Sequence, residues 1–127
     1  MATFVAVKQT TMKSILRIEE LAMTAAAIFL ISTLHMGLSW WAYVLLFFAP
    51  DVSMLGYIAG NTSGAFFYNL FHHRGVALAV AAAGLWFASP VIMFAGLMLF
   101  AHSCFDRMMG YGLKYIAGFK HTHLGDL

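Results

Sequence analysis

Four ionisable side chains interrupt an apolar sequence at spacings that suit the binding of a metal ion. His102 and Asp106 are four residues apart, so on a helix they share one face. Asp51 and the His72–His73 pair lie elsewhere in the chain and are candidate partners. Neutral imidazole and carboxylate groups are suitable ligands for Zn²⁺. We therefore predict a site for a divalent metal ion, with zinc as first candidate, made by Asp51, His72, His102 and Asp106.

This combination of residues also predicts a type of reaction. A bound metal ion would lower the pKa of water and polarise a phosphoryl or acyl oxygen, as in hydrolysis. In that hypothesis Asp51, His102 and Asp106 are catalytic, and Asn69 orients a metal ligand. Periodicity leaves His73 as an alternative to His72.

Three basic residues are candidates for holding an anionic lipid headgroup. They are Arg74, Lys114 and Lys120, and a membrane lipid is the expected partner. Arg74 has a simpler alternative, which is to extend to the membrane interface without taking part in a site.

Other functions remain open from these residues. His102 and Asp106 alone would make a hydrogen-bonded pair that locks helix packing, and Asp51 after Pro50 would cap a broken helix. A small proton-coupled transporter would use a membrane acid such as Asp51 or Asp106. An accessory subunit of a larger membrane complex would use a histidine to bind a pigment or haem, or would bind nothing.

The composition identifies the class of protein. Of 127 residues, 62% are hydrophobic and 9% are charged, whereas about a quarter are charged in an ordinary soluble domain. Only Asp51 and Arg74 are charged between Leu21 and Phe105. A net charge of +2 without a basic stripe argues against nucleic-acid binding. The chain is therefore expected to be an integral membrane protein.

Turn residues divide this apolar region into four expected spans. They cover about 18–34, 39–58, 65–88 and 90–107, and form one all-α membrane domain, 1–127, as a four-helix bundle. Small residues four apart, such as Ala77 and Ala81, favour close helix packing. A homo-oligomer or a larger complex is left open.

The basic residues and tryptophans predict the orientation. Lysines and arginines flank the first and fourth spans, which places both termini in the cytoplasm of a multi-pass inner-membrane protein. Trp40, Trp41 and Trp86 fall at the opposite ends of the spans, as in an interfacial aromatic belt. In this topology Asp51, His72 and His102 reach one depth, in the cytoplasmic half of the membrane.

The C-terminal segment after span four has two alternatives. It is expected to be a solvated tail, or a lid that folds back under the bundle. His121 and His123 would bind a metal together only in an extended segment, where alternate residues share a face.

Several motifs resemble a known family. They are Phe48-Ala49-Pro50-Asp51-Val52-Ser53-Met54-Leu55-Gly56-Tyr57, then Tyr68-Asn69-x-x-His72, then Ala101-His102-x-x-x-Asp106-Arg107-x-x-Gly110-Tyr111-Gly112-Leu113-Lys114-Tyr115, then Gly118-Phe119-Lys120-x-Thr122-His123-Leu124-Gly125. In this order they resemble the bacterial membrane family called domain of unknown function 4260. The resemblance implies no established activity.

A more distant resemblance bears on chemistry. The order Pro-Asp, His-His-Arg-Gly and His-x-x-x-Asp is similar to that of membrane-bound metal-dependent hydrolases, which are related to zinc phospholipases of the C type. By position, this implicates Asp51, His72 or His73, His102 and Asp106. The chain has Val52-Ser53 after Asp51, and Val76-Ala77 after Arg74-Gly75, where that group has further ligands. The resemblance therefore implies a site for one ion rather than two.

Overall fold

The computed structural model describes residues 1–127 and confirms that the chain is all-helical apart from a short hairpin. Its helices are α1 (Ala2–Thr33), α2 (Trp40–Phe48), the 3₁₀ helix η1 (Ala49–Ala59), α3 (Asn61–His72), α4 (Arg74–Trp86) and α5 (Pro90–Met109). The antiparallel strands β1 (His121–Thr122) and β2 (Gly125–Asp126) follow.

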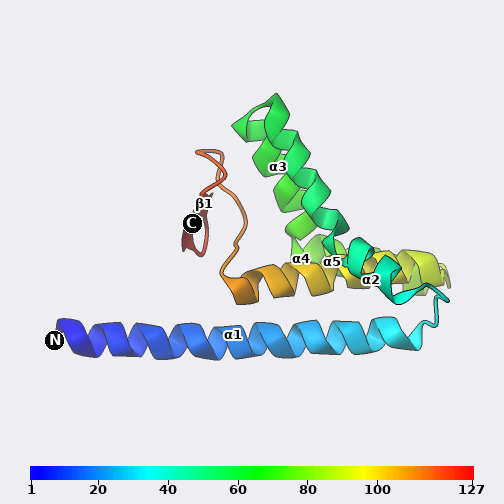
Figure 1. Ribbon diagram of the computed structural model, residues 1–127, viewed down its shortest axis with the longest axis horizontal. Helices are drawn as coiled ribbons and strands as arrows, with labels where there is room; N and C mark the ends of the chain where they lie inside the picture. Colours follow the sequence, from blue (N-terminus) through cyan, green and yellow to red (C-terminus); the bar gives the residue numbers. More distant parts are fainter.

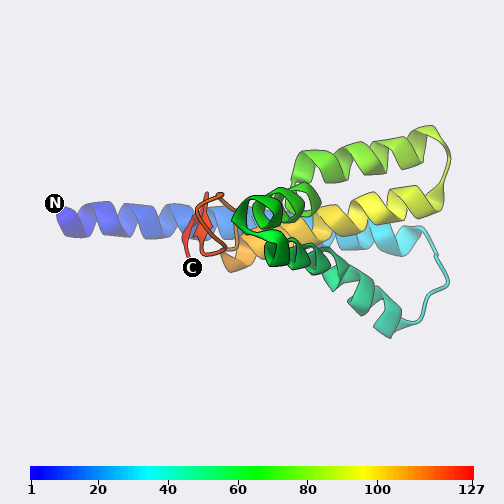
Figure 2. The same cartoon turned by 90° about the horizontal axis from the view of Figure 1, so that it is seen from above.

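Helix α5 is the centre of the arrangement, because α1, α2 and α4 all pack against it. Helices η1 and α3 pack on each other and rise away from α1 as a separate arm (Figures 1 and 2). The core beside α5 is small and includes Ala27, Ile31, Phe94 and Met98. The polar residues of interest lie where the arm meets α5.

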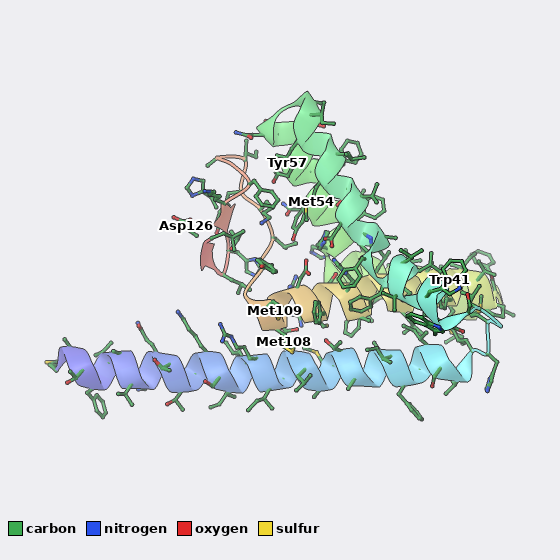
Figure 3. All side chains as sticks on the ribbon, viewed as in Figure 1. Trp41, Met54, Tyr57, Met108, Met109 and Asp126 are labelled. Atoms are coloured by element: carbon green, nitrogen blue, oxygen red, sulfur yellow. The ribbon has the colours of Figure 1, made fainter.

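Apolar surface is the main feature of the exterior. Only 21 of the 127 residues are buried, and large apolar side chains cover every helix. Two helical stretches, Trp40–Ala59 and Pro90–Met109, are long and apolar enough to cross a membrane. In Figure 3, Trp41 lies at the opposite end of α5 from Met109. These features support membrane association.

The structure differs from the expectation of continuous helices over 39–58 and 65–88. The first stretch changes from α-helix to 3₁₀ helix at Ala49, next to Pro50, and the second is divided between α3 and α4 at His73. His73 has an extended backbone, and its Nδ1 accepts a hydrogen bond from the N–H of Val76 at 3.3 Å. A capping residue of this kind starts a new helix and so ends the previous one.

Helix α1 also begins earlier than the expected start of the first span near residue 18. Residues 2–17 continue the same helix, and its N-terminal end extends beyond the other elements, as Figure 1 shows. This segment contains no glycine or proline, so nothing in its sequence interrupts the helical hydrogen bonds.

Helices α4 and α5 approach each other through small residues. A Cβ atom added at Gly96 would collide with the backbone of Ala81, and one added at Gly84 would collide with the backbone of Met93. Ala77 is completely buried and Ala81 faces Gly96, in line with the close packing expected from their spacing. This contact fixes α4, and therefore the end of α3 that precedes it, against α5.

We expect Gly96→Leu to destabilise the protein by about 1–3 kcal/mol, because the new side chain must separate α4 from α5. Thermal unfolding in detergent measures the effect. The matched control is Ala79→Leu, which adds a similar volume at an exposed position on α4 and should leave the unfolding midpoint almost unchanged. Equal destabilisation by both variants would contradict the assignment of Gly96 to this contact.

Candidate metal centre

The predicted ligands Asp51, His72, His102 and Asp106 come together in the structure. Asp51 is in the first turn of η1, His72 is the last residue of α3, and His102 and Asp106 are one turn apart on α5. One potential ligand atom from each residue lies within 4.8 Å of the other three. The cluster could therefore hold a metal ion.

Five of the six distances between these atoms resemble the edges of a tetrahedron, and the sixth, between the two carboxylate oxygens, is within 4.8 Å. The two histidine Nε2 atoms are 3.1 Å apart, and Asp51 Oδ1 lies 3.4 Å from that of His72 and 3.2 Å from that of His102. Asp106 Oδ2 lies 3.3 Å and 3.5 Å from the same two nitrogens. A tetrahedral zinc site with bonds of about 2.0–2.2 Å has ligand–ligand distances of about 3.3–3.6 Å. The four atoms are thus spaced as ligands of one ion.

The ring of His72 is oriented so that a lone pair of Nε2 can face this space. Its Nδ1 lies 2.8 Å from the carbonyl oxygen of Tyr68, which can only accept, so Nδ1 carries the proton. In the neutral ring Nε2 is then unprotonated. A backbone hydrogen bond that fixes the tautomer in this way is typical of a histidine that binds a metal.

Tyr68 supports the cluster a second time through its side chain. Its ring stacks on that of His72, with centroids 3.8 Å apart, and its hydroxyl donates a hydrogen bond to Asp106 Oδ2 at 3.2 Å. Tyr68 is buried, so it holds one ligand from each of α3 and α5 in place.

His102 lies in an apolar environment. It is completely buried, and the rings of Phe47 and Phe48 contact it edge-on at centroid distances of 5.5 Å and 6.1 Å. Its Nδ1 is buried without a hydrogen-bond partner, so the polar contacts of this ring are all made by Nε2, inside the cluster.

Asp51 forms the accessible edge of the cluster. Its side chain is 34% exposed, whereas those of His72, His102 and Asp106 are exposed by 3%, 0% and 11%. Beside it a cavity of about 690 Å³ is lined by Asp51 and apolar side chains of α2 and η1. A molecule would therefore reach the cluster from the side of Asp51.

The structure also places the alternative histidine and the first basic residue. His73 is exposed and caps α4, so it is not in the cluster. Arg74 pairs with Glu20 of α1, with its Nη1 3.0 Å from Oε1, and also contacts Met23. This ion pair ties α1 to the start of α4.

The C-terminal segment folds back against the arm rather than extending into solvent. Asn69 makes two hydrogen bonds with the backbone of Lys114: Nδ2 donates to the carbonyl at 2.7 Å, and Oδ1 accepts from the N–H at 2.6 Å. Phe119 packs against Tyr57, at a centroid distance of 5.4 Å. Figure 3 shows Tyr57 on the arm and Asp126 on the hairpin that faces it. Asn69 thus anchors this segment, and both of its side-chain hydrogen bonds are made with Lys114.

Lys114 is buried by this fold. Its Nζ lies 4.0 Å from the ring centroid of Phe119 and 5.0 Å from that of Tyr68, and burial lowers the pKa of Lys114 from its ordinary value. Tyr68 also contacts the cluster, so its ring lies between Lys114 and the cluster. Lys120 is exposed on the hairpin.

His121 and His123 have separate partners. His121 Nδ1 pairs with Asp126 Oδ1 at 2.9 Å, while His123 Nδ1 accepts a hydrogen bond from the N–H of Leu113 at 2.8 Å. The two side chains therefore do not form a second site.

The comparison with protein families agrees with the resemblance that these motifs indicate. The family model described as "Domain of unknown function (DUF4260)" matches residues 13–127. The chain belongs to this family. No curated protein and no solved structure matches it.

The DUF4260 match includes all four members of the cluster and the folded-back segment. Tyr68 is the residue whose role we did not predict from the sequence. The available signal was its spacing, because Tyr68 and His72 are four residues apart on one helix face.

We expect the C-terminal segment to detach as the pH falls. Burial and the positive charges of Arg107 and Arg74 lower the pKa of His123, so the detached segment takes up a proton more readily than the docked one. Docking is then complete above the ordinary histidine pKa of about 6.5 and is lost as the pH falls through the lower pKa of the docked state. Hydrogen exchange of the Leu113 amide, corrected for intrinsic rates, measures this.

The control for this prediction is His123→Asn. An asparagine side chain offers an acceptor for the Leu113 N–H but does not titrate, so protection should no longer depend on pH. An unchanged pH dependence in this variant would contradict the assignment to His123.

Proposed function

We propose that this protein is a metal-dependent hydrolase of the bacterial inner membrane that acts on a membrane lipid. The observation that supports it most is the set of four ligand atoms, two from histidines and two from aspartates, with zinc-like spacing and one accessible edge at Asp51. Two neutral histidines and two carboxylates carry a charge of −2, which a divalent cation neutralises. Burial of these charges without a cation would be costly.

In this proposal α1, α2, α4 and α5 form the membrane bundle, with both termini in the cytoplasm. The positive charges near the first and last helices and the tryptophans at the other end support that orientation. The arm begins with η1, which completes the apolar stretch Trp40–Ala59, and α3 then lies toward the cytoplasmic side, where the headgroups of that leaflet are. Lys120, which is exposed, would attract an anionic headgroup, whereas Lys114 is buried.

The residues have distinct roles in hydrolysis. His72, His102 and Asp106 are the buried ligands, and Tyr68 keeps His72 and Asp106 oriented. Asp51, the fourth candidate ligand, lies at the accessible edge, where an ester group and water would approach. A divalent ion held by these residues would supply Lewis-acid activation of the ester and of water.

Metal analysis tests the site itself. Protein purified without an affinity tag should contain about one zinc or other divalent ion per chain, because each chain has one set of four ligands. His72→Ala and His102→Ala should each reduce the metal content at least about tenfold. His73→Ala is the matched control and should keep the metal, because His73 caps α4. No stoichiometric ion in the wild-type protein would refute the site.

Isotope labelling tests the reaction. Mixed micelles of phosphatidylglycerol and phosphatidylethanolamine, incubated with the protein in ¹⁸O-water, should yield a product with one ¹⁸O atom by mass spectrometry. A chelator should stop this, added zinc should restore it, and Asp106→Asn should slow it at least about 100-fold. A protein that contains the metal but yields no labelled product would instead support an accessory role.

A further inference from the structure

A long apolar groove runs along the membrane bundle, between α1 and α2, with α5 as its floor. It has a volume of about 840 Å³, and Ile28, Val44 and Met98 are among the side chains of the three helices that line it. None of the four cluster residues lines this groove, and the packed side chains of the helices leave it unfilled.

Most of the side chains that line the groove are apolar, and the polar ones are Thr24, Ser32, His35 and Tyr43. The hydroxyl of Thr24 donates to the carbonyl of Glu20 at 2.8 Å, and that of Ser32 donates to the carbonyl of Phe29 at 2.6 Å. Both donors are therefore used within α1. The groove suits an apolar occupant.

One end of the groove adjoins the metal-site cluster. Phe47 and Phe48 line the groove and also contact the ring of His102. At its other end the groove reaches Gly37 and Leu38, in the loop between α1 and α2. An occupant lying in the groove would thus have one end next to His102.

The dimensions favour a lipid chain over a helix of a second protein. From Thr24 to Ser32 the groove follows α1 for about 12 Å, and the loop extends it to about 15 Å, half of a hydrocarbon core of about 30 Å. A transmembrane helix of a second protein would instead follow the bundle through the whole core. An extended acyl chain of one leaflet matches the length of the groove.

We propose that this groove binds one acyl chain of the substrate lipid and thereby places the ester or phosphoester group at the accessible edge of the cluster. The identification of the bound lipid as the substrate rests on the proposed function. It makes the substrate class a membrane lipid with at least one long acyl chain, held with its headgroup toward Asp51 and its chain toward the loop between α1 and α2.

Photo-crosslinking in vesicles of phosphatidylglycerol and phosphatidylethanolamine tests this. Two phosphatidylglycerol probes carry a diazirine, one at the end of an acyl chain and one near the glycerol. The chain-end probe should label the outer part of the groove, around Ile28 and Leu38, and the glycerol-proximal probe should label around Phe47 and Phe48. Mass spectrometry of the digested protein identifies the labelled residues.

The matched variants are Val44→Trp and Leu45→Trp. Both are on α2 and exposed, but only Val44 lines the groove. Val44→Trp should reduce labelling of the groove at least about fivefold and Leu45→Trp should leave it unchanged, while both keep the wild-type metal content.

Uniform labelling of all lipid-facing helices, or equal labelling in the two variants, would overturn the proposal. So would crosslinking of the groove to a second copy of the chain. Failure of the proposed function is separable, because it appears as absent metal or absent ¹⁸O product in a protein whose groove is still labelled in the expected order.

Discussion

The structure depends on the convergence of two carboxylates and two imidazole nitrogens in one buried space. The Nε2 atoms of His72 and His102 are only 3.1 Å apart, so two N–H groups directed into that gap would repel each other. One proton between these nitrogens leaves the negative charges of Asp51 and Asp106 incompletely compensated, in surroundings with a low dielectric constant. A divalent cation would compensate both charges, and its ligands would have a spacing close to that observed.

This convergence requires the helix breaks. A straight helix over residues 39–58 or 65–88 would carry Asp51 or His72 along one axis and past the other ligands. The change to a 3₁₀ helix at Ala49 instead puts Asp51 in the first turn of a new element, and the break at His73 makes His72 the last residue of α3. Asp51 and His72, at the ends of their elements, then meet His102 and Asp106 of α5. The arm thus brings the start of η1 and the end of α3 to α5.

The sequence was sufficient for the helical class, for Asp51, His102 and Asp106 of the cluster and for the small residues of α4, because charge scarcity and spacing are local signals. It did not decide between His72 and His73, since either one faces α5 for some rotation of a continuous helix. The break at His73 depends on the hydrogen bond that its side chain accepts from the Val76 N–H. This hydrogen bond competes with the backbone hydrogen bonds of a continuous helix. The docking of the C-terminal segment through Asn69 joins residues 45 apart in sequence, which periodicity cannot predict.

The supports of the cluster differ between its sides, and that difference bears on function. On the α3 side, Tyr68 holds both His72 and Asp106, and the segment around Lys114 covers Tyr68. On the α1 side, the Arg74–Glu20 pair fixes α4. Asp51 is held by neither and is the most exposed of the four side chains. A purely structural metal would gain from closure on all sides, because structural zinc sites are closed, whereas catalytic sites keep an open position. The proposed catalysis therefore depends on the one carboxylate that lies at the accessible edge, with three buried side chains behind it.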